Sequence, residues 1–265
     1  MPGVIPPAVS RWLAASAVAV GGVAILVSSA NDRPADHPAV RTTEPAAAPP
    51  ATQPATNPAH PFRANVKVEV TDDFFIVHSN GLPDHDTGPF PNRHNPNTIR
   101  EQNYTFKVPR HPKLSDKVTP TPMGPIGVAV NGVPFYNPYT REGQDAAKSE
   151  VFDECCGHPD PMGRYHYHIY PKCIHTSFKD EPAEHSPLIG YAFDGYAIYG
   201  PNGEDGKPPA DLDECNGHSD AVRGYHYHVT NKFPYILGGY HGEVERSNLD
   251  GPGRRPPMPP RDDRP

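Results

Sequence analysis

The chain repeats one short pattern: IGVAVNGVPFYNP at residues 126–138 returns as IGYAFDGYAIYGP at residues 189–201. Each copy consists of two short β-prone runs around Asn-Gly or Asp-Gly, dipeptides that tolerate the positive φ angles of a two-residue hairpin turn. A second pattern follows each hairpin: DECCGHPDPMGRYHYH at 153–168 returns as DECNGHSDAVRGYHYH at 213–228, with nearly the same offset. Two repeats in the same order indicate a tandem duplication whose unit is a hairpin, a loop and a histidine-bearing strand.

The sequence before the repeats also favours strands. Residues 66–70 and 104–108 alternate between apolar and polar side chains, and residues 74–77 form an apolar run, all of which are typical of β-strands. The stretch between them, 78–97, is dense in Gly, Pro, Asn and Asp, and this composition predicts a long ordered loop. Residues 144–151 are the best candidate for a short helix.

These patterns predict a mainly β protein. We expect a single β-rich domain at residues 63–250, built on a tandem duplication with pseudo-two-fold symmetry and carrying few short helices. The two repeat units span about 126–186 and 189–245. The 37 prolines of the chain argue against long uninterrupted helices and against a polytopic membrane protein.

The two ends of the chain have different compositions from the middle. Arg11 precedes an uncharged run over 12–27, and small residues follow at 28–30, which predicts a secretory signal at 1–30 with cleavage after Ala30. An uncleaved N-terminal anchor is the alternative. Residues 31–62 and 251–265 are rich in proline and lack apolar periodicity, so we expect a disordered linker and a disordered tail. In either case the domain is predicted to be secreted or extracytoplasmic.

The charge of the chain excludes one class of partner, and its histidine content points to one kind of chemistry. The net charge is −7 and the pI is near 6.1, so the chain offers no basic surface for the phosphates of nucleic acid. It has 15 histidines but only four cysteines and four methionines.

The histidines are placed so that several of them can meet. In a strand with the sequence Tyr-His-Tyr-His the tyrosines point to one face and the histidines to the other. Each strand is preceded by a further histidine in a Cys-x-Gly-His turn, which gives two His-x7-His-x-His sets. Three neutral imidazoles are typical of zinc and copper sites. The predicted metal ligands are His158, His166, His168, His218, His226 and His228.

Several alternatives stay open at this stage. The sets are expected to form two separate sites, or one functional and one vestigial site, rather than a single six-imidazole site; alternatively, the histidines can face solvent on half-buried strands. Zn(II) and Cu(II) are favoured, with Fe(II) and Mn(II) also open, because the cysteines are better used in disulfides. Asp153 and Asp213 are candidates to orient a ligand imidazole from outside the ligand set or to handle protons, and Asp194 is a third catalytic candidate. His85, between Asp84 and Asp86, is a further possible ligand that can complete or gate the site.

The same residues resemble those of the YHYH-domain family of mostly secreted proteins. The resemblance covers roughly residues 65–245 and rests on SNGLPDHDTG, NGVPFYNPY, the two YHYH segments, IGYAFDGYAIYGP and FPYILGGYHG. It implies export and one integral domain, and it adds the Asp194-Gly195 hairpin as a signature element. It implies no particular reaction. Two positions depart from the family pattern: Gly239, where the family tends to have a cysteine, and Cys156, where it tends to have glycine or a small polar residue.

The four cysteines suggest two disulfides, for which three connectivities exist. The duplication favours Cys155 or Cys156 as the partner of Cys173, with Cys215 taking the remaining one. We therefore predict the pairs Cys155–Cys173 and Cys156–Cys215.

Two functions follow from these observations. The first is a secreted metalloprotein that binds Zn or Cu through the histidine sets, with no assigned reaction. The second is a non-catalytic extracellular module that binds carbohydrate or another component of the cell surface, for which Tyr191, Tyr196 and Tyr199 are the candidate contact residues.

Overall fold

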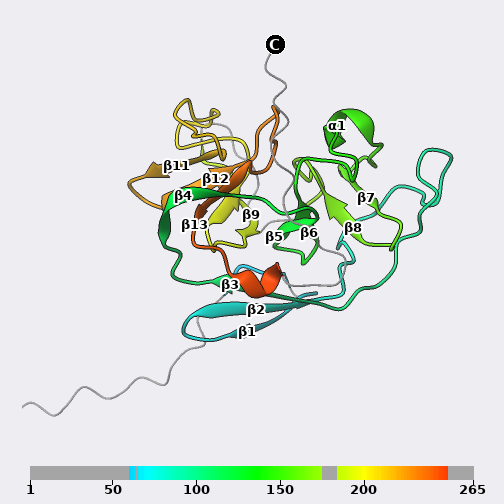
Figure 1. Ribbon diagram of the computed structural model, residues 1–265, viewed down its shortest axis with the longest axis horizontal. Helices are drawn as coiled ribbons and strands as arrows, with labels where there is room; N and C mark the ends of the chain where they lie inside the picture. Colours follow the sequence, from blue (N-terminus) through cyan, green and yellow to red (C-terminus); the bar gives the residue numbers. More distant parts are fainter. Residues whose placement is uncertain (1–59, 64, 175–183, 250–265) are drawn as a thin grey trace, which may run out of the picture. The chain divides into compact units, whose positions relative to one another are not determined.

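A computed structural model describes residues 60–63, 65–174 and 184–249 (Figure 1). This part of the chain is mainly β, as expected, with one short α-helix and one 3-10 turn. The expected signal at 1–30, most of the linker at 31–62 and the tail at 251–265 lie outside the described residues. The elements are β1 (Lys67–Val70), β2 (Phe74–Ser79), β3 (Tyr104–Pro109), β4 (Leu114–Pro120), β5 (Pro125–Ala129), β6 (Pro134–Tyr136), α1 (Ala146–Ser149), β7 (Gly157–Pro159), β8 (Tyr165–Tyr167), β9 (Leu188–Ala192), β10 (Ala197–Tyr199), β11 (Gly217–Asp220), β12 (Gly224–His228), β13 (Gly239–Gly242) and η1 (Arg246–Asn248).

The main sheet has eight strands in the order β11-β12-β10-β9-β5-β6-β8-β7. The order is symmetric about its centre, because each repeat unit supplies four equivalent strands and the two units meet at the antiparallel pair β5 and β9. Val128 pairs with Tyr191 there, and these two residues occupy equivalent positions of the repeated hairpin. A pseudo-two-fold axis therefore passes through this pair, which confirms the duplication predicted from the sequence.

The outer strands obey the same symmetry. The parallel pairing of Phe135 with Tyr167 in the first unit returns as the pairing of Ile198 with Tyr227 in the second. The predicted hairpins are β5–β6 and β9–β10. Gly132 and Gly195, the second residues of Asn-Gly and Asp-Gly, have φ values of 84° and 90°, the region that the hairpin turn requires and that glycine adopts without strain.

Two smaller sheets accompany the main one: β1-β2-β3 and β13-β4. The core unites all three sheets, and its largest fully buried side chains include Tyr165, Tyr167 and Tyr227 from the repeated strands. Phe62 is also buried in this core, packed against Phe75 and Tyr191. Phe62, which the sequence places in the linker, is therefore a member of the core.

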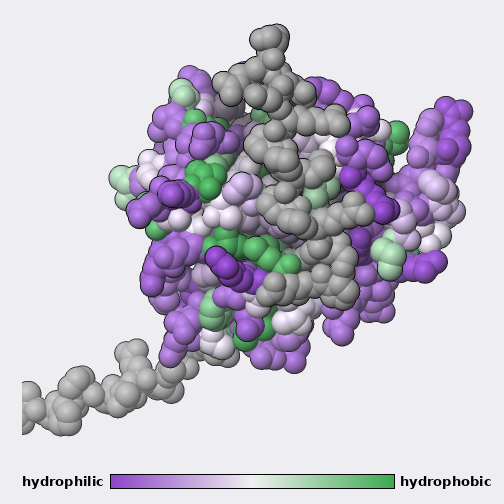
Figure 2. All heavy atoms as spheres, viewed as in Figure 1, coloured by the Kyte–Doolittle hydropathy of each residue, from purple (hydrophilic) through white to green (hydrophobic). Residues whose placement is uncertain are grey.

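The short helix α1 lies inside the stretch predicted to be helical. Asp145 begins it as the N-cap, with its carboxylate accepting a hydrogen bond from the amide of Ala147. Among the described residues, no helix has the length and apolar character that crossing a membrane requires. Hydrophilic residues predominate on the face shown in Figure 2, where hydrophobic residues form only small separate patches.

Candidate metal centres

The Tyr-His-Tyr-His sequences separate two kinds of side chain, as strand geometry demands. Tyr165 and Tyr167 of β8 enter the core, and His166 and His168 point to the other face of the strand. The neighbouring edge strand β7 places His158 directly opposite His166. In the second unit β11 and β12 repeat this register with His218 opposite His226. The short Gly-His edge strand is therefore what brings the third imidazole to the other two.

The first histidine site consists of His158, His166 and His168. Their Nε2 atoms converge: His166 Nε2 lies 3.1 Å from that of His158 and 3.0 Å from that of His168. All three side chains are almost completely buried, with exposed fractions of 5%, 2% and 3%. Nitrogens bound tetrahedrally to zinc at the usual bond length lie about 3.3 Å from one another. The spacing of the three nitrogens therefore fits a single ion.

The hydrogen bond of Nδ1 in each ring determines which tautomer of the histidine is present. The Nδ1 atoms of His158, His166 and His168 lie 3.3, 2.9 and 2.6 Å from the carbonyl oxygens of Val151, Arg164 and Asn137. A carbonyl oxygen only accepts hydrogen bonds, so each Nδ1 carries the proton and each neutral ring presents its Nε2 lone pair to the others. Three lone pairs that face one another repel unless a cation lies between them.

Glu150 places a carboxylate beside the first histidine site. Its Oε2 lies 3.4 Å from Nε2 of both His158 and His168, and it has no hydrogen-bond donor among the described residues although the atom is buried. Burial, with a smaller effect of the Glu142 charge, raises the pKa of Glu150 to about 7. Sequence reasoning missed this residue. The repeat gave no signal for it, because Ala210 stands at the equivalent position of the second unit.

The second histidine site consists of His185, His226 and His228, whose ligand atoms lie within 4.8 Å of one another, and His218 packs beside it. Nε2 of His226 lies 3.1 Å from that of His228 and 3.2 Å from that of His185. The Nδ1 atoms of His226, His228 and His185 lie 2.7 to 2.8 Å from backbone carbonyl oxygens of Gly224, Gly200 and Ser186, so the same proton form is present. His185 was not predicted, because it precedes β9 in a segment outside the repeated motifs.

His218 holds the place that the duplication predicts. Its ring centroid lies 4.7 Å from that of His226 and 5.1 Å from that of His228. Its Nδ1 lies 3.0 Å from the carboxylate of Asp211, and its buried Nε2 has no hydrogen-bond partner among the described residues. A carboxylate on the outer nitrogen of a ligand imidazole is a common arrangement in metal sites. In this site the carboxylate on the outer nitrogen of His218 belongs to Asp211, two positions before the predicted candidate Asp213.

The electrostatics keep the six histidines of the two converging groups neutral. Burial lowers the pKa of His158 to about 4 and those of His168 and His228 to about 3. The pKa values of His166, His185 and His226 are also lowered, and burial is the largest cause in each case. The rings therefore stay in the form that binds a metal throughout the physiological pH range.

The three aspartates proposed as catalytic residues lie away from both histidine sites. Asp153 accepts hydrogen bonds from the Tyr165 hydroxyl at 2.7 Å and from backbone amides of its own turn, and Asp213 repeats this arrangement with Tyr225. Asp194 is fully buried and bonded to Tyr227. The prediction that Asp153 and Asp213 orient ligand imidazoles is therefore wrong: they hold tyrosines, which point to the opposite face of the strand.

His85 also lies on the tyrosine side. Its Nε2 lies 2.7 Å from the hydroxyl of Tyr167, so strand alternation separates it from His166 and His168. Neither it nor its neighbours complete the first histidine site. Asp84 instead accepts a hydrogen bond from Asn131, and the predicted gating role of this loop finds no contact to support it among the described residues.

One predicted disulfide is present and the other is not. Cys155 and Cys173 are bonded, whereas Cys156 and Cys215 are both free and buried. The correction follows from the topology. Cys156 precedes β7 and Cys215 precedes β11, and these are the opposite edges of an eight-stranded sheet. The duplication makes Cys215 the counterpart of Cys155, so the two units carry their cysteines apart.

The three tyrosines considered for carbohydrate binding have different ring partners. Tyr191 contacts Phe62 and Phe75, Tyr196 is 9% exposed against Tyr225, and Tyr199 contacts His185.

Comparison with known families matches residues 105–208 to the model described as YHYH protein. The chain carries a YHYH-family domain. The match includes the first Tyr-His-Tyr-His strand and the second hairpin, so the resemblance read from the sequence is confirmed. The duplicated strand of the YHYH domain, 225–228, lies beyond the matched residues. No curated protein and no solved structure matched the chain.

Proposed function

We propose that this YHYH-domain protein is an exported metalloprotein that holds two divalent cations, one in each histidine site. The observation that carries the proposal is the convergence of neutral imidazoles whose Nδ1 atoms are all engaged by oxygen acceptors. In each site Nε2 lone pairs face one another at 3.0 to 3.2 Å. A buried cation between the Nε2 atoms would satisfy such an arrangement, and the outer hydrogen bonds resemble those of known zinc ligands.

The donor atoms favour Zn(II) or Cu(II). Both sites offer imidazole nitrogen and have a carboxylate beside them, that of Glu150 in the first and that of Asp220, which also accepts from Arg223, in the second; neither group includes a cysteine or methionine sulfur. Cu(I) prefers sulfur ligands, whereas imidazole suits the divalent ions. Each site brings three imidazoles together, and Glu150 and His218 lie beside them as the candidate fourth donors that a structural zinc site requires. With that fourth position filled, such an ion would hold the domain together rather than catalyse a reaction.

Export is supported by two features. The first is the N-terminal sequence with a basic residue, an uncharged run and small residues at 28–30. The second is the disulfide between Cys155 and Cys173, since such bonds persist mainly in oxidising compartments. Fractionation of the native host, followed by N-terminal sequencing of the mature chain, tests this part; a cytoplasmic protein starting at Met1 contradicts it.

The metal proposal is tested by counting ions in protein purified without a histidine tag or a metal column. We expect two equivalents of Zn or Cu by elemental mass spectrometry. Glu150→Gln should weaken the first histidine site and His185→Gln the second, each reducing the content toward one equivalent. Both residues lie at the edges of their sites, so the fold should survive. His111→Ala, at an exposed position, is the matched control and should retain two equivalents.

Two outcomes contradict the proposal. One is wild-type protein that takes up no ion from Zn(II) or Cu(II) solutions. The other is a metal content that the double variant His166→Ala/His168→Ala and its counterpart His226→Ala/His228→Ala leave unchanged while circular dichroism shows both to be folded.

A further inference from the structure

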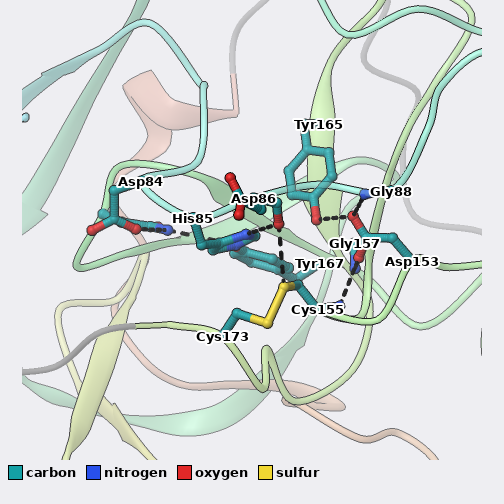
Figure 3. Close-up of a disulfide and its surroundings, with 11 residues drawn as sticks. Asp84, His85, Asp86, Gly88, Asp153, Cys155, Gly157, Tyr165, Tyr167 and Cys173 are labelled. Atoms are coloured by element: carbon teal, nitrogen blue, oxygen red, sulfur yellow. Dashed lines mark hydrogen bonds between the residues drawn. A yellow bond between two sulfur atoms is a disulfide. The ribbon is translucent and has the colours of Figure 1, made fainter.

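The tyrosine side of the first unit gathers a third set of metal-ligating atoms, separate from both histidine sites. One ring nitrogen of His85 and the Sγ atoms of Cys155 and Cys173 all lie within 4.8 Å of one another. Figure 3 shows the three residues together with Tyr167 and Asp153. They come from three distant parts of the sequence: the long loop before β3, the turn before β7 and the segment after β8.

We propose that this set is a metal site under redox control: closed while Cys155 and Cys173 are disulfide-bonded, and able to hold a thiophilic cation such as Zn(II) once they are reduced. Thiolates are strong zinc ligands and disulfide sulfurs are not. The site is independent of the two-ion proposal above, because it uses different residues on the opposite face of β8.

The orientation of His85 supports a ligand role. Its Nδ1 lies 2.8 Å from the carbonyl oxygen of Asp86, so Nδ1 carries the proton and Nε2 presents its lone pair, as in the two histidine sites. That lone pair accepts a hydrogen bond from the Tyr167 hydroxyl at 2.7 Å. An incoming ion replaces this hydrogen bond.

The cysteines are placed so that reduction can occur without unfolding the site. The amide of Cys155 is fixed by the carboxylate of Asp153 at 3.0 Å, and Sγ of Cys155 lies 3.4 Å from the Asp86 carbonyl oxygen. Cys173 is partly exposed, so a reductant can reach its sulfur. The second unit provides an internal comparison: Cys215, the counterpart of Cys155, has no disulfide partner and belongs to no such set among the described residues.

The chemistry balances with a phosphine reductant and water. The S–S bond breaks as the phosphine transfers two electrons to sulfur and takes the water oxygen to become its oxide, and the two water protons yield two thiols. A divalent cation then displaces both thiol protons, so that two thiolates and the neutral His85 imidazole bind it. A dithiol reductant achieves the same step by forming its own disulfide.

Cadmium titration tests the proposal, because Cd(II) bound to thiolate has an ultraviolet charge-transfer absorption that Cd(II) bound to imidazole lacks. The protein is the full chain carrying Cys156→Ser and Cys215→Ser, so that only the proposed thiolates remain, with its histidine sites first saturated with Zn(II). After phosphine reduction we expect one Cd(II) per chain with the thiolate band, and no band in the oxidised protein. His85→Ala should weaken the binding at least about tenfold, while His94→Ala, an exposed histidine of the same loop, should not.

The outcomes separate this site from the others. A thiolate band that needs no reduction, or an affinity for Cd(II) that His85→Ala leaves unchanged, overturns the proposal, as does a reduced protein with two free thiols and no band. His85→Ala retains the disulfide in its oxidised form, so a folding defect can be excluded by circular dichroism before reduction. Loss of Zn(II) from the histidine sites instead bears only on the two-ion proposal.

Discussion

Replacement of Asp194 by asparagine should change the pH dependence of stability in a defined direction. Asp194 is fully buried and accepts hydrogen bonds from the Tyr227 hydroxyl at 2.5 Å and from the amide of Gly242 at 3.0 Å. These bonds favour the charged form, but burial outweighs them and raises the pKa from 3.8 to about 6. The equivalent residue of the first unit is already an amide, Asn131.

The sign follows from proton binding. Between pH 4 and 6 the folded protein retains the Asp194 proton that the unfolded chain has lost, so the folded state binds more protons and its stability falls as the pH rises. A shift of about two pKa units corresponds to roughly 3 kcal/mol. The asparagine variant lacks this effect. Relative to wild type, its free energy of unfolding should therefore increase by roughly 2.5 kcal/mol between pH 4 and 7, because the unfolded carboxyl group is already more than half ionised at pH 4.

Urea unfolding followed by far-ultraviolet circular dichroism measures this difference. EDTA keeps both proteins metal-free, and the acid titration of the buried histidines cancels in the comparison. Asparagine loses part of the hydrogen bonding that the Asp194 carboxylate provides to Tyr196 and Gly242, which shifts the whole curve but not its slope. Asp116→Asn, at an exposed position, should follow wild type. Parallel profiles for Asp194→Asn and wild type would refute the reasoning.

Three further outcomes are expected. Asn131→Asp should destabilise the protein by about 3–5 kcal/mol in urea unfolding at pH 7, because the new carboxylate faces Asp84 where the amide now donates to it; a loss below about 1 kcal/mol counts against this. Gly239→Cys should form a disulfide with Cys215, whose Sγ lies 3.3 Å from the place that a Cβ would take at residue 239. Closing the loop between residues 215 and 239 should raise the free energy of unfolding by about 3.5 kcal/mol, and the close contact of the new Cβ with Val118 should lower it by about 1–3 kcal/mol. Peptide mapping that finds free thiols at both positions would exclude this disulfide. Removal of bound ions with EDTA should lower the thermal midpoint, since the Nε2 lone pairs then face one another; an unchanged midpoint means that the ions do not stabilise the fold.

Most of the fold and of the histidine sites that could be predicted from the sequence followed from the duplicated motifs. Strand alternation alone separates His166 and His168 from Tyr165 and Tyr167, and the Asn-Gly and Asp-Gly turns place the hairpins. The repeats could not reveal a donor that the second unit lacks: Glu150 reaches the first site from the end of α1. Its sequence neighbourhood is an ordinary polar helix end, so no local pattern marks the carboxylate as a ligand.

The aspartates show a second reason why the sequence could not predict the whole site. Asp153 and Asp213 occupy equivalent positions in the repeat, so the sequence correctly predicts that they share one role. Which role it is depends on the face of the strand that each carboxylate approaches. Each carboxylate accepts from the amides two and four positions later, an arrangement that shapes the turn leading into the edge strand. That turn directs the carboxylate to the tyrosine hydroxyl and the following histidine to the opposite side. The spacing between the aspartate and the strand is the same whether the carboxylate binds a tyrosine or a histidine, so the sequence cannot distinguish the two roles.

The two histidine sites gather their donors by different means, and this bears on whether one of them is only a remnant of the duplication. The first site uses all three imidazoles that strand register provides, with Glu150 beside them, whereas the second combines His226 and His228 with His185, which comes from a segment with no counterpart, and has His218 beside it. Facing lone pairs in a buried site are unfavourable without a cation, and both sites have them. A site that no longer bound metal would relieve this repulsion by letting one ring turn away or accept a proton, yet burial holds the pKa of His228 as low as that of His168. We therefore expect an ion in each unit, and a protein that binds only one equivalent should have its second site rearranged.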